Sequence, residues 1–287
     1  VAILVDEYDK PMLQAIGNET LQQSFRSTLQ AFYGALKSKD GCIKFAFLTG
    51  VTKFGKISVF SALNNLMDLS MWNDYVALCG ITEQELRDNF KEGIEELAKA
   101  QRMTDEEVCA VLKENYDGYH FTEDSIGIYN PFSLLNTFAK RRFGNYWFET
   151  GTPTYLVELL KMHDYDLHEM AHVETDEDTL NSIDSSSTNP IPVIYQSGYL
   201  TIKEYDARFK LYKLEFPNAE VRYGFLNFIT PFYSSITEEA RGFYIGKFVH
   251  ELESGDVDAF MRRMRAFFAD FPYELNDKTE RHYQVVF

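Results

Sequence analysis

This sequence has no long apolar run, no closely spaced pair of cysteines, and fewer basic than acidic residues. No apolar run approaches the ~20 residues that a membrane-spanning helix needs, so we expect no membrane partner. The three cysteines (Cys42, Cys79 and Cys109) are odd in number and have no CxxC spacing, which argues against a disulfide framework or a zinc site. We therefore expect reduced thiols in a cytoplasmic protein.

Positive charge is also scarce. The chain has 28 Lys and Arg against 44 Asp and Glu, a formal net charge of −16. Proteins that bind nucleic acid in general need a basic surface to displace the counterions of the phosphates, so this balance weighs against that class. The 45% hydrophobic and 15% aromatic content of the 287 residues nevertheless indicates a folded protein with a substantial core.

The first 50 residues alternate between strand and helix patterns. Ala2–Val5 is an apolar run, typical of a strand that is covered on both faces, and "CIKFAFLTG" predicts a second buried strand. Between them a helix is predicted, with a capping box at Thr20 and Gln23 and an end at Gly41. Its apolar face carries Leu21, Phe25, Leu29, Phe32 and Leu36. A strand, a crossover helix and a strand form the βαβ unit of a parallel sheet, so the predicted fold class is α/β.

The rest of the chain is predicted to be mainly helical. Residues 58–115 are expected to be mostly helix, with capping boxes at Thr82/Glu85 and Thr104/Glu107, and Asn130 and Pro131 are expected to begin another helix. The acidic, serine-rich stretch 173–190 predicts a mobile surface loop. Alternation on both sides of "DAR" predicts a β-hairpin over Gly198–Asn218, and helix is expected again over Phe225–Phe271.

Two adjacent carboxylates, Asp6 and Glu7, follow the first predicted strand. Ligands of open parallel sheets bind beyond the carboxyl ends of the strands. Phosphoryl transfer needs a magnesium ion near the phosphates and a water aimed at the terminal phosphorus. Asp6 would hold the metal through its water shell, and Glu7 would orient or deprotonate the attacking water. The alternative is that two acids end the strand because a turn follows, with Pro11 soon after.

The second predicted strand strengthens the nucleotide interpretation. It ends in "TGVT", which places Thr49 and Thr52 at the same edge, where hydroxyls could contact a terminal phosphate. An apolar strand ending in Asp-Glu, one helix, and an apolar strand ending in a hydroxyl is a rare combination. The sequence therefore predicts a nucleotide site with Asp6, Glu7, Thr49 and Thr52 as its residues.

The chain also resembles a known family. The matching segments, in order, are "ILVDEYDKP", "FLTGVTKFGK", "SALNNLMDLS", "YVALCGITEQEL", "YDGYHF", "YNPFSLLNTF", "YQSGYLTI" and "FPNAEVRYGF". They are similar to predicted AAA-ATPase-like proteins in which the ATPase region is followed by a nuclease domain of the PD-(D/E)XK type. The resemblance implies a P-loop NTPase core that binds ATP and Mg²⁺, with Val5-Asp6-Glu7 as the Walker B strand and Thr52 near the sensor-1 position.

Two departures from that family limit the expectation. No "GxxxxGK[ST]" loop is present, and the one Gly-Lys pair, Gly55–Lys56, follows the second strand. No Asp…Glu-x-Lys constellation follows the closing "ERHYQVVF", which resembles the lead-in to the nuclease. We expect the chain to be the middle of a longer protein, with the phosphate-binding loop before Val1 and the nuclease after Phe287, and not to bind ATP tightly or act alone.

The resemblance also suggests how the chain is divided. Residues 1–125 would be a partial ATPase core, 126–224 a helical, winged-helix-like region with the hairpin as its wing, and 225–287 a helical linker. The acidic charge favours a lid or signalling role for the wing over DNA reading. An arginine that contacts the terminal phosphate is expected for the family, and the sequence does not choose among Arg87, Arg102, Arg141 and Arg142.

One motif competes with this interpretation. "HEMAH" at His168–His172 fits the H-E-x-x-H signature of zinc peptidases, in which the two histidines bind zinc and Glu169 acts as general base. The motif runs into the acidic stretch, and a downstream ligand such as Asp184 or Glu204 stays open. The alternatives to an ATPase are thus a non-hydrolysing module that binds protein or nucleic acid, and a zinc peptidase. Nucleic acid would be a partner through the nuclease domain, and oligomerisation is left open.

Overall fold

The computed structural model describes residues 1–15, 18–51, 66–149, 156, 160, 173–181, 189–233, 247 and 249–269. The chain divides into two compact units. The first contains Val1–Tyr165 and Glu169–Arg222, and the second contains Asp166–His168 and Tyr223–Phe287. The predicted boundaries after residues 125 and 224 stay predictions.

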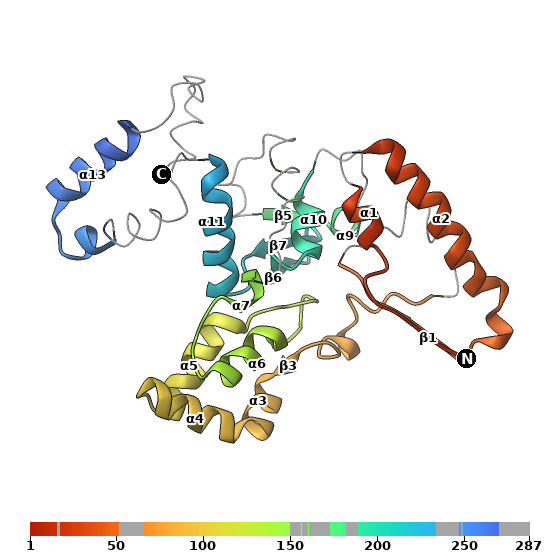
Figure 1. Cartoon of the computed structure of the whole chain (residues 1–287), viewed down its shortest axis with the longest axis horizontal. Coiled ribbons are helices and arrows are strands. Elements are labelled where there is room, and N and C mark those ends of the chain that lie inside the picture. The colour runs from red at the N-terminus through yellow and green to blue at the C-terminus, as the bar shows by residue number, and fades with distance from the viewer. Residues whose placement is uncertain are drawn as a thin grey trace. The chain divides into compact units, whose positions relative to one another are not determined.

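The chain begins with the predicted strand–helix–strand order (Figure 1). Strand β1 (Ala2–Val5) is followed by helix α1 (Lys10–Gln14), helix α2 (Glu19–Ser38), the 3-10 turn η1 (Asp40–Cys42) and strand β2 (Phe45–Leu48). β1 and β2 pair in parallel, with Val5 opposite Leu48. The parallel arrangement is therefore confirmed, as a two-stranded sheet among the described residues.

The local details of this unit differ from the prediction in two places. Helix α2 is capped by Asn18, whose side chain accepts a hydrogen bond from the backbone N–H of Leu21, rather than by Thr20. The buried face of α2 contains Tyr33, which is 3% exposed, whereas Phe32 is 61% exposed. Both residues are apolar enough to satisfy the helical period, and the tilt of the helix on the sheet decides between them.

One face of the β1–β2 sheet is covered and the other is open. Ile3, Val5 and Leu48 pack against Tyr33 and Leu36 of α2. On the opposite face Leu4 is 74% and Phe45 is 55% exposed, and the Phe45 ring stacks on that of Phe47. The prediction that β1 is covered on both faces is therefore wrong for this structure.

A helical cluster follows. Residues 66–80 form turns and the 3-10 turn η3 (Asn73–Tyr75), so the predicted helix is absent there. The next elements are β3 (Ile81–Thr82), α3 (Glu83–Asn89), α4 (Lys91–Gln101), α5 (Asp105–Tyr116), β4 (Ile128–Tyr129), α6 (Pro131–Lys140) and α7 (Tyr146–Glu149). Both capping boxes and the Asn130 cap are confirmed.

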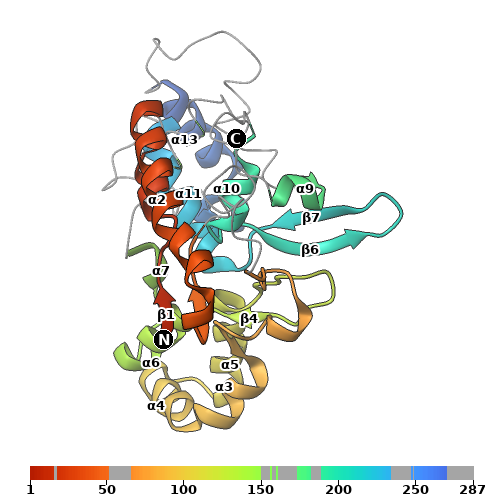
Figure 2. The same ribbon diagram turned by 90° about the vertical axis from the view of Figure 1, so that its right-hand side faces the viewer.

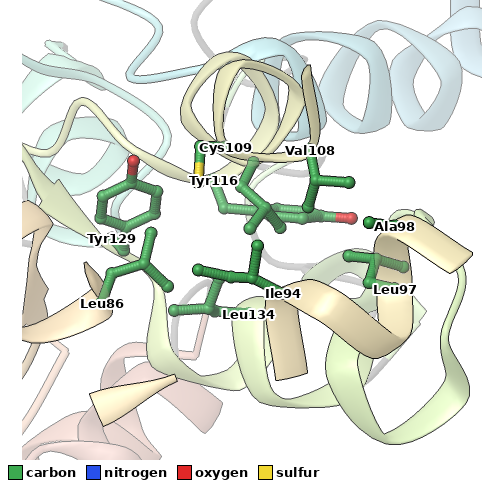
Figure 3. Close-up of a cluster of buried hydrophobic side chains, with 10 residues drawn as sticks. Leu86, Ile94, Leu97, Ala98, Val108, Cys109, Tyr116, Tyr129 and Leu134 are labelled. Carbon is green, nitrogen blue, oxygen red and sulfur yellow. The ribbon is translucent and has the colours of Figure 1, made fainter. Parts of the chain in front are cut away.

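These helices enclose an apolar cluster of buried side chains (Figure 3). Its buried members come from α3, α4, α5, β4 and α6, and the close-up labels Leu86, Ile94, Leu97, Ala98, Val108, Cys109, Tyr116, Tyr129 and Leu134. The hydroxyl of Tyr116 both donates to the carbonyl oxygen of Gly144 and accepts from its N–H, each at 3.0 Å. The hydroxyl of the buried Tyr116 therefore has hydrogen-bond partners in the backbone of Gly144.

A three-stranded antiparallel sheet closes the first unit. Its strands are β5 (Val173–Thr175), β6 (Thr201–Asp206) and β7 (Leu211–Glu215), in the order β5-β7-β6, with α9 (Glu177–Leu180) and α10 (Ile191–Gln196) between β5 and β6. The predicted hairpin is β6–β7, which extends as a ribbon in Figure 2. A winged helix is not established by these elements.

Composition predicts a loop over residues 173–190. That prediction is wrong for residues 173–180, which contain β5 and α9. Val173 and Thr175 are buried where β5 pairs with β7, and Asp176 caps α9 by accepting from the N–H of Thr179. Leu180 is buried as well. Residues 182–188 lie outside the described residues.

The second unit contains most of α11 (Ala219–Tyr233) and the whole of α13 (Val257–Ala269). Among the residues that the structure describes, no helix has the length and apolar character needed to cross a membrane. The cytoplasmic location stays a prediction.

Candidate functional site

The ends of β1 and β2 lie side by side. Because Val5 is opposite Leu48, the residues that follow the two strands, Asp6 and Thr49, meet at one edge of the sheet. The N–H of Thr49 donates to the carbonyl oxygen of Val5 at 2.9 Å, and the N–H of Tyr8 donates to the carbonyl oxygen of Thr49 at 2.9 Å. The two loops after the strands are therefore joined by backbone hydrogen bonds.

Asp6 and Thr49 are in direct contact. The Thr49 hydroxyl donates to Asp6 Oδ1 at 2.6 Å, and the backbone N–H of Glu7 donates to the same oxygen at 3.0 Å. Two donors on one oxygen fix the orientation of the carboxylate, and the Asp6 residue is exposed to solvent. An oriented, accessible carboxylate has the chemistry that Mg²⁺ takes, either directly or through a water.

Glu7 has an unusual backbone. Its φ is +51°, in the left-handed region, where an L-residue is about 1–2 kcal/mol less stable than in the right-handed region. Three other described non-glycine residues have positive φ: Arg102 and Arg141 end helices, and Lys210 lies in the turn of the β6–β7 hairpin. Those are ordinary positions for this conformation. Glu7 instead follows a strand, beside Asp6, and strained residues of this kind cluster at functional sites.

The Glu7 carboxylate contacts Lys10. The ammonium group of Lys10 lies 2.6 Å from Glu7 Oε2, and both side chains are more than half exposed. An exposed ion pair contributes only about 0–1 kcal/mol, so Lys10 does not hold the carboxylate firmly. Glu7 can therefore turn toward a ligand at the sheet edge at little cost.

A further acidic residue, Asp9, was missed by the sequence analysis. It is 1% exposed, and its Oδ1 accepts a hydrogen bond from the N–H of Val51 at 3.1 Å. A Cβ on Gly50 would lie 2.6 Å from that oxygen and 2.7 Å from the Tyr8 ring, so only glycine fits between them. The signal that could have revealed Asp9 is the glycine in the turn after the second strand, Gly50, opposite the acidic turn after the first.

The other predicted site residues do not add to this edge. Thr52 lies outside the described residues. Arg87 is engaged by Glu83 at 2.6 Å and by Glu106 at 3.3 Å, and Arg141 is engaged by Glu96 at 2.9 Å. Arg102 and Arg142 lie at the ends of α4 and α6, and nothing in their positions distinguishes one of the four as a phosphate ligand.

The competing zinc motif cannot be placed. His168–His172 and Asp184 lie outside the described residues. Glu204 is in β6, where the ammonium group of Lys213 lies 3.4 Å from it. The described part of the chain contains no group of three or more His, Cys, Asp or Glu side chains that could hold a metal ion.

A second set of titratable groups lies where the segment after α5 contacts β6. Lys203 donates to the carbonyl oxygens of Gly118 at 3.2 Å and Pro217 at 3.1 Å. Burial raises the pKa of Asp117, lowers the pKa of His120, and lowers the pKa of Lys203. The backbone of His120 completes the junction: its N–H donates to the hydroxyl oxygen of Thr201 at 2.7 Å, and that hydroxyl donates to the His120 carbonyl oxygen at 2.8 Å. The hydrogen bonds of Lys203 and Thr201 hold the hairpin to the segment after α5, whereas Asp117 Oδ1 is buried without a hydrogen-bond partner among the described residues.

Comparison with known proteins matches the beginning of the chain to an ATPase family. Residues 1–60 match the family described as predicted AAA-ATPase. This range contains Asp6, Glu7 and Thr49 at the ends of β1 and β2, which we call the strand-edge site. The match does not extend to the helical cluster or the hairpin.

A longer relative covers nearly the whole chain. It is an uncharacterized protein encoded in the vnfD 5' region of Azotobacter chroococcum mcd 1, 34% identical over 280 residues, or 96% of this chain. The chain spans about half the length of that relative, 51%. No solved structure matches the chain.

Proposed function

We propose that the chain is part of an AAA-like ATPase and that the phosphates of ATP, with Mg²⁺, bind at the ends of β1 and β2. The contact between Asp6 and Thr49 is the observation that carries the proposal. It joins a carboxylate and a hydroxyl from two parallel strands at the edge where open sheets bind ligands. The family match over residues 1–60 supports the same assignment.

Each site residue has a role in this proposal. Asp6 holds Mg²⁺ through the metal's water shell, because its carboxylate is oriented and exposed. Glu7 orients the attacking water and accepts its proton. Thr49 contacts the terminal phosphate through its hydroxyl, and in doing so exchanges its hydrogen bond to Asp6. Thr52 is proposed as a second such contact, from its position in the sequence.

The phosphate-binding loop is proposed to come from another part of a longer polypeptide. This chain contains no "GxxxxGK[ST]" loop. The open face of the β1–β2 sheet, with Leu4 and Phe45 exposed, supports further α/β structure against it, because parallel sheets are almost always covered on both faces. ATP binding and hydrolysis are therefore assigned to the longer protein, with this chain contributing the residues that act on the terminal phosphate.

The remaining regions are proposed to respond to the nucleotide. On the resemblance to ATPases fused to a PD-(D/E)XK nuclease, hydrolysis would move the helical cluster and the β6–β7 hairpin, and so regulate a nuclease domain elsewhere in the polypeptide. The formal net charge of −16 supports a lid or signalling role for the hairpin rather than contact with DNA.

The test is Glu7→Gln in the full-length polypeptide. The neutral amide cannot accept the proton of water, so ATP turnover should fall by at least 100-fold while the Kd for MgATP stays within about threefold. The matched control is Glu19→Gln, which removes one exposed carboxylate at the start of α2 and should change neither quantity. Wild-type turnover in Glu7→Gln would refute the catalytic assignment. Binding of MgATP without turnover in the wild type would instead indicate a non-hydrolysing nucleotide module.

A further inference from the structure

Asp9 lies between the two loops that form the strand-edge site. It is the last residue before α1, and its backbone carbonyl oxygen accepts hydrogen bonds from Met12 at 2.9 Å and Leu13 at 3.1 Å. Its side chain makes no cap bond to that helix. The carboxylate is turned away from its own helix and toward the loop after β2.

Two groups of the loop after β2 lie against this carboxylate. The N–H of Val51, in the loop after β2, donates to Asp9 Oδ1 at 3.1 Å. The Gly50 backbone approaches so closely that a Cβ there would lie 2.6 Å from the same oxygen. In α2, burial raises the pKa of the Tyr33 phenol, and the negative charge of Asp9 raises it further.

Burying a carboxylate carries a large free-energy penalty unless hydrogen bonds compensate it. A side chain that only had to fill this space could be apolar, as its neighbours Met12 and Tyr33 largely are. An apolar side chain could not accept the hydrogen bond from the N–H of Val51, two residues after Thr49. Asp9 is thus built to fix the loop after β2 relative to the loop after β1.

We propose that Asp9 is a positioning residue of the nucleotide site, which holds the loop Thr49–Val51 so that the Thr49 hydroxyl faces Asp6 and Glu7. This inference rests on the function proposed above. Asp9 does not contact the nucleotide in this account. It acts through the backbone of Val51.

The first measurement needs no nucleotide. Hydrogen exchange of the Val51 amide is followed by NMR in this chain and in its Asp9→Asn and Asp9→Ala variants. Removing the acceptor should speed exchange at Val51 by tenfold or more in Asp9→Ala, given the typical strength of a hydrogen bond to a charged group. Asp9→Asn keeps an oxygen acceptor and should lie between the wild type and Asp9→Ala. An unchanged exchange rate at Val51 would show that Asp9 does not hold the loop after β2.

The second measurement is ATP turnover by the full-length polypeptide. Asp9→Ala should lower kcat at least tenfold and leave the Kd for MgATP within about threefold, because Thr49 and Glu7 act on the terminal phosphate rather than in the phosphate-binding loop. Asp9→Asn should recover part of that loss. A purely structural role would not produce this separation of kcat from Kd.

The control is Leu36→Ala, which removes packing from the apolar cluster of Tyr33 and Leu36 and leaves the Asp9 carboxylate and its hydrogen bond from Val51 in place. It should lower the thermal unfolding temperature and leave kcat per folded molecule within about twofold. If Leu36→Ala does not fold, Leu36→Val takes its place. An equal loss of kcat in Asp9→Ala and in the control would show that Asp9 is merely structural.

The two proposals fail differently. If Glu7→Gln abolishes turnover and Asp9→Ala does not lower kcat, the positioning role is wrong and the ATPase assignment stands. If the wild-type polypeptide neither binds nor hydrolyses ATP, the ATPase assignment fails and the positioning role fails with it, whatever the exchange rate at Val51.

Discussion

Because Glu7 has a left-handed backbone, we expect a glycine variant at this position to be more stable than an alanine variant, the reverse of the order in a helix interior. Alanine at this position keeps the strain of a φ near +51°, about 1–2 kcal/mol, whereas glycine relieves it. Glycine also gains entropy in the unfolded chain, which lowers stability by about 0.5–1 kcal/mol. Both variants lose the Lys10 ion pair, so that contribution cancels. The Glu7→Gly variant should therefore be more stable than Glu7→Ala, by up to about 1.5 kcal/mol and by about 0.75 kcal/mol at the middle of both ranges.

The matched control is Gln23, an exposed residue in the interior of α2. There the Gly variant should be less stable than the Ala variant by about 1 kcal/mol, because glycine is a poor helix residue. Urea unfolding followed by circular dichroism gives both differences under the same conditions. If Glu7→Gly is less stable than Glu7→Ala, as at Gln23, Glu7 does not have a left-handed backbone and the strain argument for the site fails.

Three further predictions concern the first unit. The variant Tyr116→Phe should lose about 2 kcal/mol in urea unfolding, because both backbone groups of Gly144 lose their partner, and a loss below about 0.5 kcal/mol would contradict that pairing. The variant Thr104→Ala should lose about 1 kcal/mol with the capping box of α5, and a double variant with Glu107→Ala should lose little more if the two side chains act as one cap. Burial raises the pKa of Asp117 above its unfolded value, so its ionisation weakens the fold as the pH rises. The variant Asp117→Asn should therefore increase stability at pH 7, by an amount that shrinks toward pH 4, and a gain that grows on acidification would reverse this account.

The strand–helix–strand order was predictable because its signals are local. Four apolar residues followed by Asp6-Glu7, a helical period over α2, and a second apolar run specify the unit without long-range information. The capping boxes of α3 and α5 are local in the same sense. The helical period does not decide which of Phe32 and Tyr33 is buried, because both residues fit it. The packing of α2 on the sheet buries Tyr33.

The short strand β5 shows the opposite case. Composition predicts a polar loop for "VETDEDTL", because four acidic residues and few large apolar ones cannot form a core alone. The pairing partner of Val173–Thr175 is β7, about 40 residues further along the chain, and it buries Val173 and Thr175. Because the formation of so short a strand depends on pairing with β7, no local pattern in the sequence predicts β5.

The candidate site was predictable in part for a related reason. Asp6 and Thr49 follow strands that the pattern identifies, and their contact at 2.6 Å agrees with the expected shared edge. Asp9 was missed because its contact with Val51 depends on how two turns fit together. The left-handed backbone of Glu7 has no sequence signal, since glycine, the residue usual at positive φ, is not used there.

The most direct test of the central claim is hydrogen exchange of the full-length polypeptide with and without a slowly hydrolysed MgATP analogue. The account predicts that protection increases in peptides that cover Asp6–Lys10 and Thr49–Val51, since the phosphates and metal bind there, with Asp6→Ala as the control that should abolish the change. Analogue binding that protects other segments and leaves both of these peptides unchanged would contradict it.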